Sequence, residues 1–252
     1  MTTFVHSGNL GDIIYSLPAV RALGGGTMYI KLDGVADAIR KYNNGPVPDD
    51  YRGRLSAKDF EMLAPLLDAQ PYIEATQVFH PNQTVEVDLD QFRAVAGQSF
   101  ATNFLSTYNK ALGLPDGDIS GEWPWLFVEP TKIAEFVVCR SARYRSNKSS
   151  TIPTWKAIID GNDFENRAVF VGLPEEAEEF NQLFDVSIPY YKCKDFLDMA
   201  QVIAGADTFF GNQTFAYGIA QGLGKDTVLE TLTWRPLVNN ECFFERDGCV
   251  YF

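Results

Sequence analysis

Two short stretches of the chain place acidic, amide and hydroxyl side chains directly after an apolar run. The first, Ser7 to Asp12, reads Ser-Gly-Asn-Leu-Gly-Asp, and the second, Gly211 to Thr214, reads Gly-Asn-Gln-Thr. A strand, a glycine turn and a helix in this order point free helix N–H groups beyond the sheet edge, where they bind anions. An aspartate at such an edge is also placed to accept a proton. The two stretches therefore predict an anion site and a general base.

The second stretch is interpreted as the place where a diphosphate sits. A buried strand is expected to end in a turn at Gly211, and a helix follows at once. Asn212, Gln213 and Thr214 supply caps and polar side chains for that corner. The alternative is that strand, glycine, asparagine and helix are simply how an α/β protein turns.

The first stretch has a functional and an ordinary interpretation as well. In the functional one, Asp12 is a general base that takes a proton from a hydroxyl group of an acceptor substrate. Ser7, Gly8, Asn9 and Gly11 then form the loop on the side of that acceptor. In the ordinary one, Asp12 caps a helix and stabilises it by about 1 kcal/mol. Pro18 lies within the apolar pattern of that helix, which predicts a kink or a late helix start.

Charge adds two further candidates for anion binding. The chain carries a net charge of −12, which repels phosphate polymers at long range. Within it, Arg140, Arg143, Arg145 and Lys148 form a compact basic cluster. A cluster of this kind in an acidic chain favours an anionic ligand, and the alternative is a solvated basic loop. Glu230 ends a predicted strand and is a candidate to accept ribose hydroxyls, with an edge-strand surface charge as the alternative.

One motif points to a different chemistry. Asp88-Leu89-Asp90 is an acid-x-acid triple, a spacing of carboxylates that binds manganese in some enzymes. Strand alternation would put both acids on one face. Because an acidic chain produces such triples by chance, we interpret this one as a solvated strand end and expect no metal site.

The elements that position these residues alternate between strands and helices. Strands are expected at 3–6, 27–31, 72–79, 84–89, 135–139, 168–171, 186–188 and 227–230, with another ending at Phe210. Such alternation predicts parallel sheets with right-handed crossovers. Two such series meet near an extended stretch at 121–130. We therefore expect an α/β protein of two Rossmann-like domains, 1–130 and 131–252, facing each other across a cleft.

Composition sets limits on compartment and partners. The four cysteines have no C-x-x-C spacing, and only two histidines occur, so a zinc site is not expected. Free thiols of this kind are typical of the cytoplasm. The chain shows no secretory signal and no apolar run long enough to span a bilayer, which again predicts a cytoplasmic protein.

The segment from Ser7 to Arg21, SGNLGDIIYSLPAVR, resembles the amino-terminal signature of the heptosyltransferases of glycosyltransferase family nine. That signature is a strand, a turn ending Gly-Asp and a helix bearing Leu-Pro-Ala. Asp195 to Gly224 and the stretch Phe170 to Glu176 are also similar to segments of this family. The similarity follows chain order and is sharpest at the two ends.

The resemblance implies a GT-B fold and metal-independent transfer of a sugar from a nucleotide-sugar with no cofactor. It implies that the carboxyl half holds the donor and that Asp12 is the general base. Heptosyltransferases carry Asp-(Ser/Thr)-Gly-x-x-His at the carboxyl motif, where this chain has Gln213 to Gly218. A heptose donor is therefore not implied, and the missing acid and histidine make a non-catalytic nucleotide-sugar-binding or structural protein the alternative. The acceptor is a glycan, a protein or a modified DNA base, with DNA disfavoured by the charge.

Overall fold

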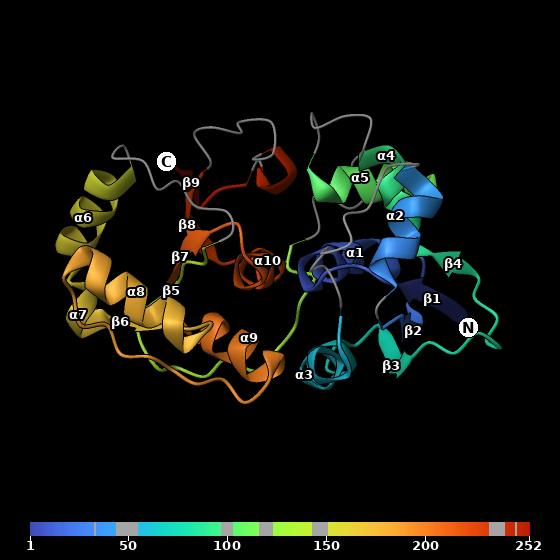
Figure 1. Cartoon of the computed structure of the whole chain (residues 1–252), viewed down its shortest axis with the longest axis horizontal. Coiled ribbons are helices and arrows are strands. Elements are labelled where there is room, and N and C mark those ends of the chain that lie inside the picture. Colours follow the sequence, from blue (N-terminus) through green and yellow to red (C-terminus); the bar gives the residue numbers. More distant parts are fainter. Residues whose placement is uncertain are drawn as a thin grey trace. The chain divides into compact units, whose positions relative to one another are not determined.

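A computed structural model of the protein describes residues 1–32, 34–43, 55–96, 103–115, 123–142, 151–231, 240–244 and 246–252. The chain divides by its internal contacts into two compact units, Met1–Phe127 and Val128–Phe252. Each unit contains its own parallel sheet, and Figure 1 shows the helices that flank the strands of each. The units are described separately below.

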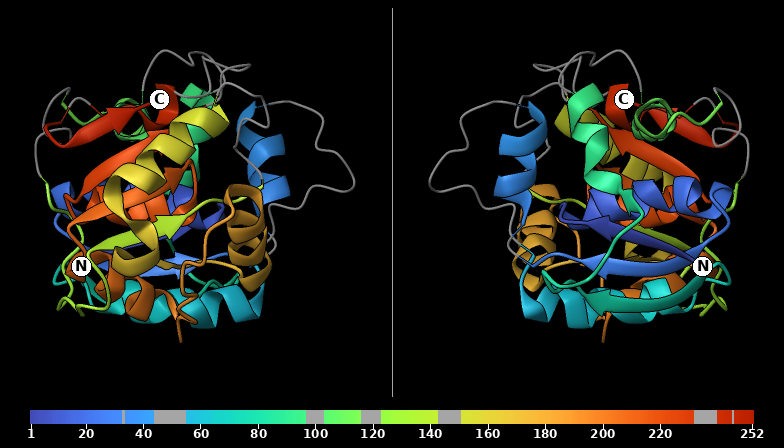
Figure 2. Two further views of the ribbon diagram at one scale, coloured as in Figure 1. Left: turned by 90° about the vertical axis from the view of Figure 1, so that its left-hand side faces the viewer. Right: turned by 90° about the vertical axis from the view of Figure 1, so that its right-hand side faces the viewer.

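Unit 1 is built on a four-stranded parallel sheet in the order β3-β2-β1-β4. The right view of Figure 2 shows the blue and teal strands β1, β2 and β3 running side by side. Its elements are β1 Thr2–His6, α1 Leu10–Ala22, β2 Gly26–Ile30, α2 Val35–Asn43, α3 Ala57–Asp68, β3 Ile73–Val78, β4 Val87–Asp88, the 3₁₀ turn η1 Leu89–Gln91, α4 Phe92–Ala96 and α5 Phe104–Leu112.

Helix α1 begins directly after the polar turn of β1, with Asn9 at its N-cap. Pro18 lies inside the helix, so the late start that the sequence suggested is wrong. The residues from Ile13 to Val20 are buried on this helix, and Tyr15 stacks on Phe104 of α5 with ring centroids 5.0 Å apart. This packing fixes the position of the first turn of α1 at the carboxyl end of β1.

The strand predicted at 84–89 is shorter in the structure. Only Val87–Asp88 pairs with β1, and the chain turns into η1 at Leu89. The physical cause is local, because the Asp88 side chain accepts a hydrogen bond from the Asp90 N–H at 3.1 Å. An aspartate that caps a turn in this way competes with strand pairing.

Unit 2 is built on a five-stranded parallel sheet in the order β6-β5-β7-β8-β9. Helices α6, α7 and α8 lie on one side of these strands and α9 and α10 on the other (Figure 1). Its elements are β5 Phe136–Cys139, α6 Thr151–Asn162, α7 Phe164–Arg167, β6 Ala168–Phe170, α8 Pro174–Phe184, α9 Phe196–Gly205, β7 Thr208–Asn212, α10 Phe215–Gly222, β8 Asp226–Glu230, the 3₁₀ turn η2 Asn240–Cys242 and β9 Cys249–Tyr251.

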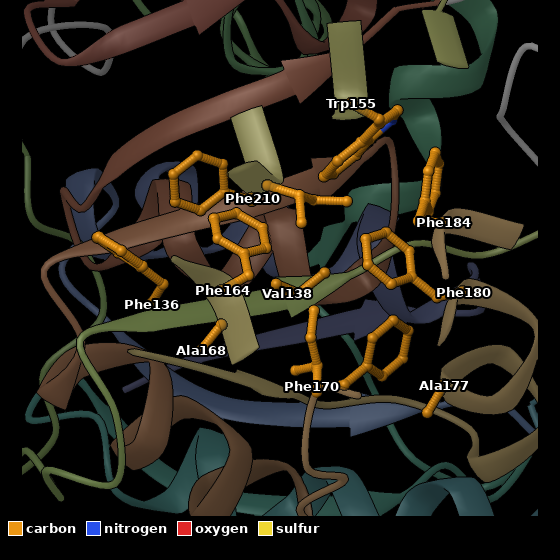
Figure 3. Packing of buried hydrophobic residues seen from close by; sticks show 12 residues of the cluster. Phe136, Val138, Trp155, Phe164, Ala168, Phe170, Ala177, Phe180, Phe184 and Phe210 are labelled. Atoms are coloured by element: carbon orange, nitrogen blue, oxygen red, sulfur yellow. The ribbon is translucent and has the colours of Figure 1, made fainter. Parts of the chain in front are cut away.

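An aromatic cluster fills the space between this sheet and the helices α6 to α8 (Figure 3). Phe210 of β7 meets Phe164 of α7 edge-on at 4.8 Å, and Trp155 of α6 meets Phe180 of α8 at 5.3 Å. Aromatic pairs of this geometry contribute about 0.5–1.5 kcal/mol each beyond the area they bury. The cluster anchors α6, and with it Trp155, against the sheet.

The strands of unit 2 differ from the prediction in two places. No strand forms at 186–188. The Asn181 side chain accepts a hydrogen bond from the Ile188 N–H and donates one to the Ile188 carbonyl, so these backbone groups are not available for strand pairing. Strand β9, which the sequence reasoning did not predict, pairs with β8.

The expected turn at Gly211 is also absent, because β7 continues to Asn212. A Cβ at Gly211 would lie 2.2 Å from the Cys139 carbonyl oxygen, so a glycine is needed for β5 and β7 to approach each other here.

Candidate functional site

The first polar site lies at the carboxyl end of β1 in unit 1. Asp12 sits in the first turn of α1, and its Oδ2 accepts hydrogen bonds from the Asn9 N–H and the Asn9 Nδ2, both at 3.3 Å. The Arg93 guanidinium of α4 donates to the same oxygen at 2.8 Å. Three donors thus converge on Oδ2, and Asp12 is both a helix cap and one half of an ion pair.

The second oxygen of Asp12 is in a different position. Within the part of the chain that the structure describes, Oδ1 makes no hydrogen bond. The Asp12 side chain keeps 13% of its surface exposed. A carboxylate held through one oxygen and open at the other has the geometry of a proton acceptor.

Asp90 lies beside this turn, after the neighbouring strand β4. Its carboxylate accepts the Ser7 hydroxyl at 2.6 Å and the Ser7 N–H at 3.3 Å. Asp90 is 1% exposed, so the interpretation of Asp88-Leu89-Asp90 as a solvated strand end is wrong for this residue. Burial raises the pKa of Asp90, and the Ser7 hydroxyl opposes that shift.

The two acids of the triple also have different partners. Asp88 accepts hydrogen bonds from Lys41 at 2.8 Å and from Tyr42 at 2.6 Å. It is the N-cap residue before η1, whereas Asp90 lies within η1. Because Asp90 belongs to a 3₁₀ turn, strand alternation does not apply to it. Among the described residues, no group of histidine, cysteine, aspartate and glutamate side chains could hold a metal ion.

A buried histidine and tyrosine complete the site in unit 1. His6 is fully buried, its Nδ1 accepts the Gly8 N–H at 2.7 Å, and its Nε2 lies 2.7 Å from the Tyr108 hydroxyl. The Tyr108 hydroxyl donates to the Asp12 carbonyl at 2.9 Å. This network assigns the proton of the neutral ring to Nε2. Burial lowers the pKa of His6 to about 3, so the ring is neutral at ordinary pH.

The turn between β1 and α1, which the sequence predicts as the acceptor-side loop, is closely surrounded by these groups. A Cβ at Gly8 would lie 2.4 Å from the His6 ring and 2.9 Å from both Arg93 Nη2 and Asp12 Cβ. Only a glycine fits there without displacing them. Ser7 is fully buried, whereas Asn9 and Gly11 are partly exposed. The structure therefore brings four of the five residues predicted at this turn (Ser7, Gly8, Asn9 and Asp12) into one hydrogen-bonded cluster.

The second polar site lies at the carboxyl edge of the sheet in unit 2. The parallel register pairs Cys139 with Gly211 and Asn212 with Glu230. Arg140, Asn212 and Glu230 are consequently neighbours on three adjacent strands. Arg140 Nε donates to Glu230 Oε2 at 2.6 Å and its Nη2 donates to Oε1 at 3.0 Å. The Trp155 indole N–H donates to Oε2 at 3.0 Å.

This arrangement changes the interpretation of both charged residues. Glu230 is 1% exposed and β8 lies between β7 and β9, so the alternative of an edge-strand surface charge is wrong. Both Glu230 oxygens already accept hydrogen bonds from protein donors. Arg140 is 3% exposed and its charge is balanced by Glu230. A bidentate pair of this kind positions the end of β5 relative to β8.

Asn212 and Thr214 organise the corner that follows β7. The Asn212 side chain accepts the Ser141 N–H at 3.0 Å and donates to the Ser141 carbonyl at 2.9 Å. Thr214 is the N-cap of α10, and its hydroxyl accepts the Tyr217 N–H at 3.2 Å. Gln213 lies between them and is partly exposed. The other predicted cations, Arg143 and Lys148, and Arg145 with them, lie outside the described residues.

Sequence reasoning missed Arg93, took Asp90 for part of a solvated strand end, and missed His6, Tyr108 and Trp155. The first two had a detectable signal, since a buried strand end followed by an acid and, three residues later, a base favours a paired turn. His6 and Tyr108 gave none, because their contact joins residues 102 positions apart.

The architecture of parallel α/β sheets in both units is that of solved glycosyltransferases, and the expected resemblance to family nine is confirmed at the level of fold. A family nine glycosyltransferase from Veillonella parvula is 12% identical, with a TM-score of 0.54 over 100% of this chain and 85% of that chain. The E. coli heptosyltransferase WaaC with ADP-2-deoxy-2-fluoro heptose is 15% identical, with a TM-score of 0.51 over 100% of this chain and 92% of that one.

A third solved structure, E. coli ADP-heptose lps heptosyltransferase II, is 11% identical, with a TM-score of 0.53 over 100% of this chain and 90% of that one. No protein-family model and no curated protein matches the sequence. Among the described helices, none has the length and apolarity needed to cross a membrane.

Proposed function

We propose that the protein is a glycosyltransferase that moves a sugar from a nucleotide-diphosphate sugar to an acceptor hydroxyl without a metal ion or other cofactor. Its fold, shared with family nine enzymes, supports the class. The observation that carries the assignment of the base is the geometry of Asp12, which is held through Oδ2 by three donors and has Oδ1 without a hydrogen bond among the described residues.

In the proposed reaction, the acceptor oxygen forms a bond to the anomeric carbon while the bond from that carbon to the phosphate oxygen breaks. The electron pair of the broken bond leaves with the nucleoside diphosphate, and the acceptor proton passes to Asp12 Oδ1. General bases of this kind contribute roughly 10²–10⁴-fold to the rate.

We assign the donor to unit 2 and the acceptor to unit 1. The Gly211–Thr214 corner precedes α10, whose N-terminal N–H groups are suited to a diphosphate. The WaaC structures hold ADP-2-deoxy-2-fluoro heptose in one case and ADP in another, which makes ADP the first nucleotide to test. Arg143 and Lys148 remain candidates for the phosphates, because Arg140 is paired with Glu230.

The test has two stages. A thermal-shift screen of ADP, UDP, GDP and their sugars identifies the donor, because a ligand of the folded state raises apparent stability by mass action. Turnover of that donor is then compared between wild type and Asp12→Asn. We expect the variant to keep its affinity for the nucleotide and to lose about 10²-fold or more in kcat. Turnover that is unchanged in Asp12→Asn would remove Asp12 as the base.

A second function is favoured by one observation, namely that Arg140, the described member of the basic cluster, is neutralised by Glu230. Together with Gln213 in place of an acid, this supports a binding or structural protein that has the fold without the chemistry. Slow release of sugar from the donor by purified wild type, insensitive to EDTA, would exclude it. Binding without any turnover would support it.

The acceptor is proposed as a glycan, a protein or a modified DNA base. DNA binding by a chain of net charge −12 would depend on a local basic patch and would weaken steeply with salt. A gel-shift titration at low and physiological salt distinguishes DNA from the other two.

A further inference from the structure

Arg93 lies between two carboxylates that belong to different elements. Its Nη2 is 2.8 Å from Asp12 Oδ2 on α1, and its Nε is 3.8 Å from Asp90 Oδ1 on η1. The Arg93 side chain is 9% exposed and its guanidinium lies 4.6 Å from the centroid of the Phe92 ring. Burial on this scale, with an aromatic ring on one face, leaves the guanidinium little freedom to move.

Asp90 is itself fixed to the loop that leads into α1. It accepts two hydrogen bonds from Ser7, and Ser7 precedes Asp12 on the same turn. Arg93 therefore lies between two acids, Asp12 and Asp90. Asp12 belongs to the first turn of α1, and Asp90 is hydrogen-bonded to Ser7 just before that helix. An isolated buried arginine would cost several kcal/mol, and two flanking carboxylates remove most of that cost.

The hydrogen bonds to Asp12 distinguish its two oxygens. Oδ2 accepts from Arg93 at 2.8 Å, which is a charge-assisted bond, and from the Asn9 groups at 3.3 Å. A partial rotation of the carboxylate away from this orientation would break the shortest of these bonds. Since Arg93 comes from a segment 81 positions away, the orientation of Asp12 depends on the fold of unit 1 as a whole.

We propose that Arg93 is the positioning residue of the reaction: it holds Oδ2 of Asp12 so that Oδ1 is presented to the acceptor hydroxyl. This inference rests on the proposed function. In the transfer step, the acceptor proton goes to Oδ1 while Arg93 stays bound to Oδ2, and Arg93 itself touches no reacting atom. Asp90 adds a second ion pair to Arg93, at 3.8 Å and without a hydrogen bond.

A purely structural ion pair would have the same distances, so the experiment measures kinetics and coupling together. The variants are Arg93→Met, Arg93→Lys, Asp12→Asn and the double variant Arg93→Met/Asp12→Asn, in the full chain. Lys110→Met is the matched control, because Lys110 is an exposed cation on α5 of the same unit. The probe is the nucleotide-sugar of the ADP, UDP and GDP panel that wild type turns over fastest.

We expect Arg93→Met to lower kcat by about a hundredfold with little change in KM for the donor, as a misplaced catalytic group does. Arg93→Lys, which keeps one charged donor, is expected to recover about tenfold of that loss. The double variant should be no slower than Asp12→Asn, since residues that act as a unit are not additive. Lys110→Met should match wild type.

Other outcomes overturn the inference. A kcat for Arg93→Met close to that of wild type shows that Asp12 needs no positioning by Arg93. A double variant slower than Asp12→Asn by the full Arg93→Met factor shows that Arg93 acts independently of Asp12. A rise in KM for the donor at unchanged kcat shows that Arg93 binds substrate instead.

Failure of the proposed function gives a different result, which is the absence of turnover by wild type. In that case the pairing is still measured by denaturant unfolding of the same four variants. A coupling of about tenfold in the unfolding constant is expected for side chains in contact. Additive effects would show that the pair itself does not form, and with no turnover in wild type the positioning role is rejected along with the function.

Discussion

The buried pair of Arg140 and Glu230 joins distant parts of the sequence. Arg140 and Glu230 are 90 positions apart, and each is at most 3% exposed. Trp155 adds a third hydrogen bond, and the guanidinium lies 5.6 Å from the centroid of the Phe184 ring. Such a pair contributes little net stability compared with an apolar substitute, but removing one partner leaves an uncompensated charge.

Glu230→Gln should therefore destabilise the protein by about 3–5 kcal/mol, because Arg140 would stay buried and charged with no counter-ion. The measurement is the urea midpoint at pH 7. Asp207→Asn is the matched control, since it removes a carboxylate from a solvent-exposed ion pair with Lys132. We expect no measurable shift of its midpoint. A wild-type midpoint for Glu230→Gln would show that the pair is not buried as described.

His6 makes stability depend on pH in a defined window. Its pKa is about 3 in the folded protein because of burial, against 6.5 for the unfolded chain, so only the unfolded state takes up a proton between these values. The folded state consequently loses stability as pH falls through this window, at roughly 1.4 kcal/mol per pH unit. Unfolding measured at pH 7 and pH 5 should show the loss in wild type.

The control for this prediction is the second histidine. His80 is exposed, so His80→Gln should lose as much stability as wild type between the two pH values. His6→Gln should lose less, although it is less stable at both. An equal loss in His6→Gln and wild type would assign the pH dependence to other groups.

At the scale of elements, the parallel register decides which side chains meet. β5, β7 and β8 end at the same edge, so Arg140, Asn212 and Glu230 become neighbours although they belong to the ends of three different strands. The close approach of β5 and β7 depends on Gly211, where a Cβ would lie 2.2 Å from the Cys139 carbonyl oxygen. A backbone atom cannot move aside as a side chain can.

Gly211→Ala should thus separate β5 from β7 and prevent unit 2 from folding to its native state. The measurement is near-UV circular dichroism, to which the buried aromatic side chains of unit 2 contribute. Gly161→Ala is the matched control, because Gly161 lies in helix α6 with nothing within 4 Å of its Cβ position. That change should stabilise the protein by about 0.5–1 kcal/mol. Native spectra for Gly211→Ala would contradict the short approach of the two strands.

Much of the element order was predictable from periodicity, whereas the partners of the charged residues were not. The β1–turn–α1 unit and the corner after β7 were found because apolar runs, glycines and caps are local signals. The roles of Asp90 and Glu230 depend on contacts with Ser7 and Arg140, far away in sequence. The missing strand at 186–188 has a local cause instead, since the side chain of Asn181, seven positions before Ile188, competes with strand pairing.

At the scale of the whole molecule, each unit has its own sheet and its own buried residues. Unit 1 contains Asp12 with Arg93, and unit 2 contains the Gly211–Thr214 corner. The assignment of the acceptor to the first and the donor to the second stays a prediction. It follows the rule that open parallel sheets bind ligands beyond the carboxyl ends of their strands.

Hydrogen exchange with and without ADP tests the assignment of the donor to unit 2. We expect added ADP to slow exchange at the amides of the corner between β7 and α10 and to leave the β1–α1 turn unchanged. UMP at the same concentration serves as the control for unspecific effects of a nucleotide. Protection confined to the β1–α1 turn would assign the donor to unit 1 and reverse the proposal.

The hydrogen bonds of Asn212 determine what deamidation of this residue would do to the protein during storage. Its side-chain amide accepts a hydrogen bond from the Ser141 N–H and donates one to the Ser141 carbonyl. These two bonds extend the hydrogen bonding between β5 and β7 beyond the ends of the strands. Deamidation would replace the Nδ2 donor by an oxygen facing the Ser141 carbonyl and would put a negative charge at a fully buried position. Stored samples that accumulate a more acidic species at this residue should therefore lose the order of the β5–β7 edge before any other change becomes visible.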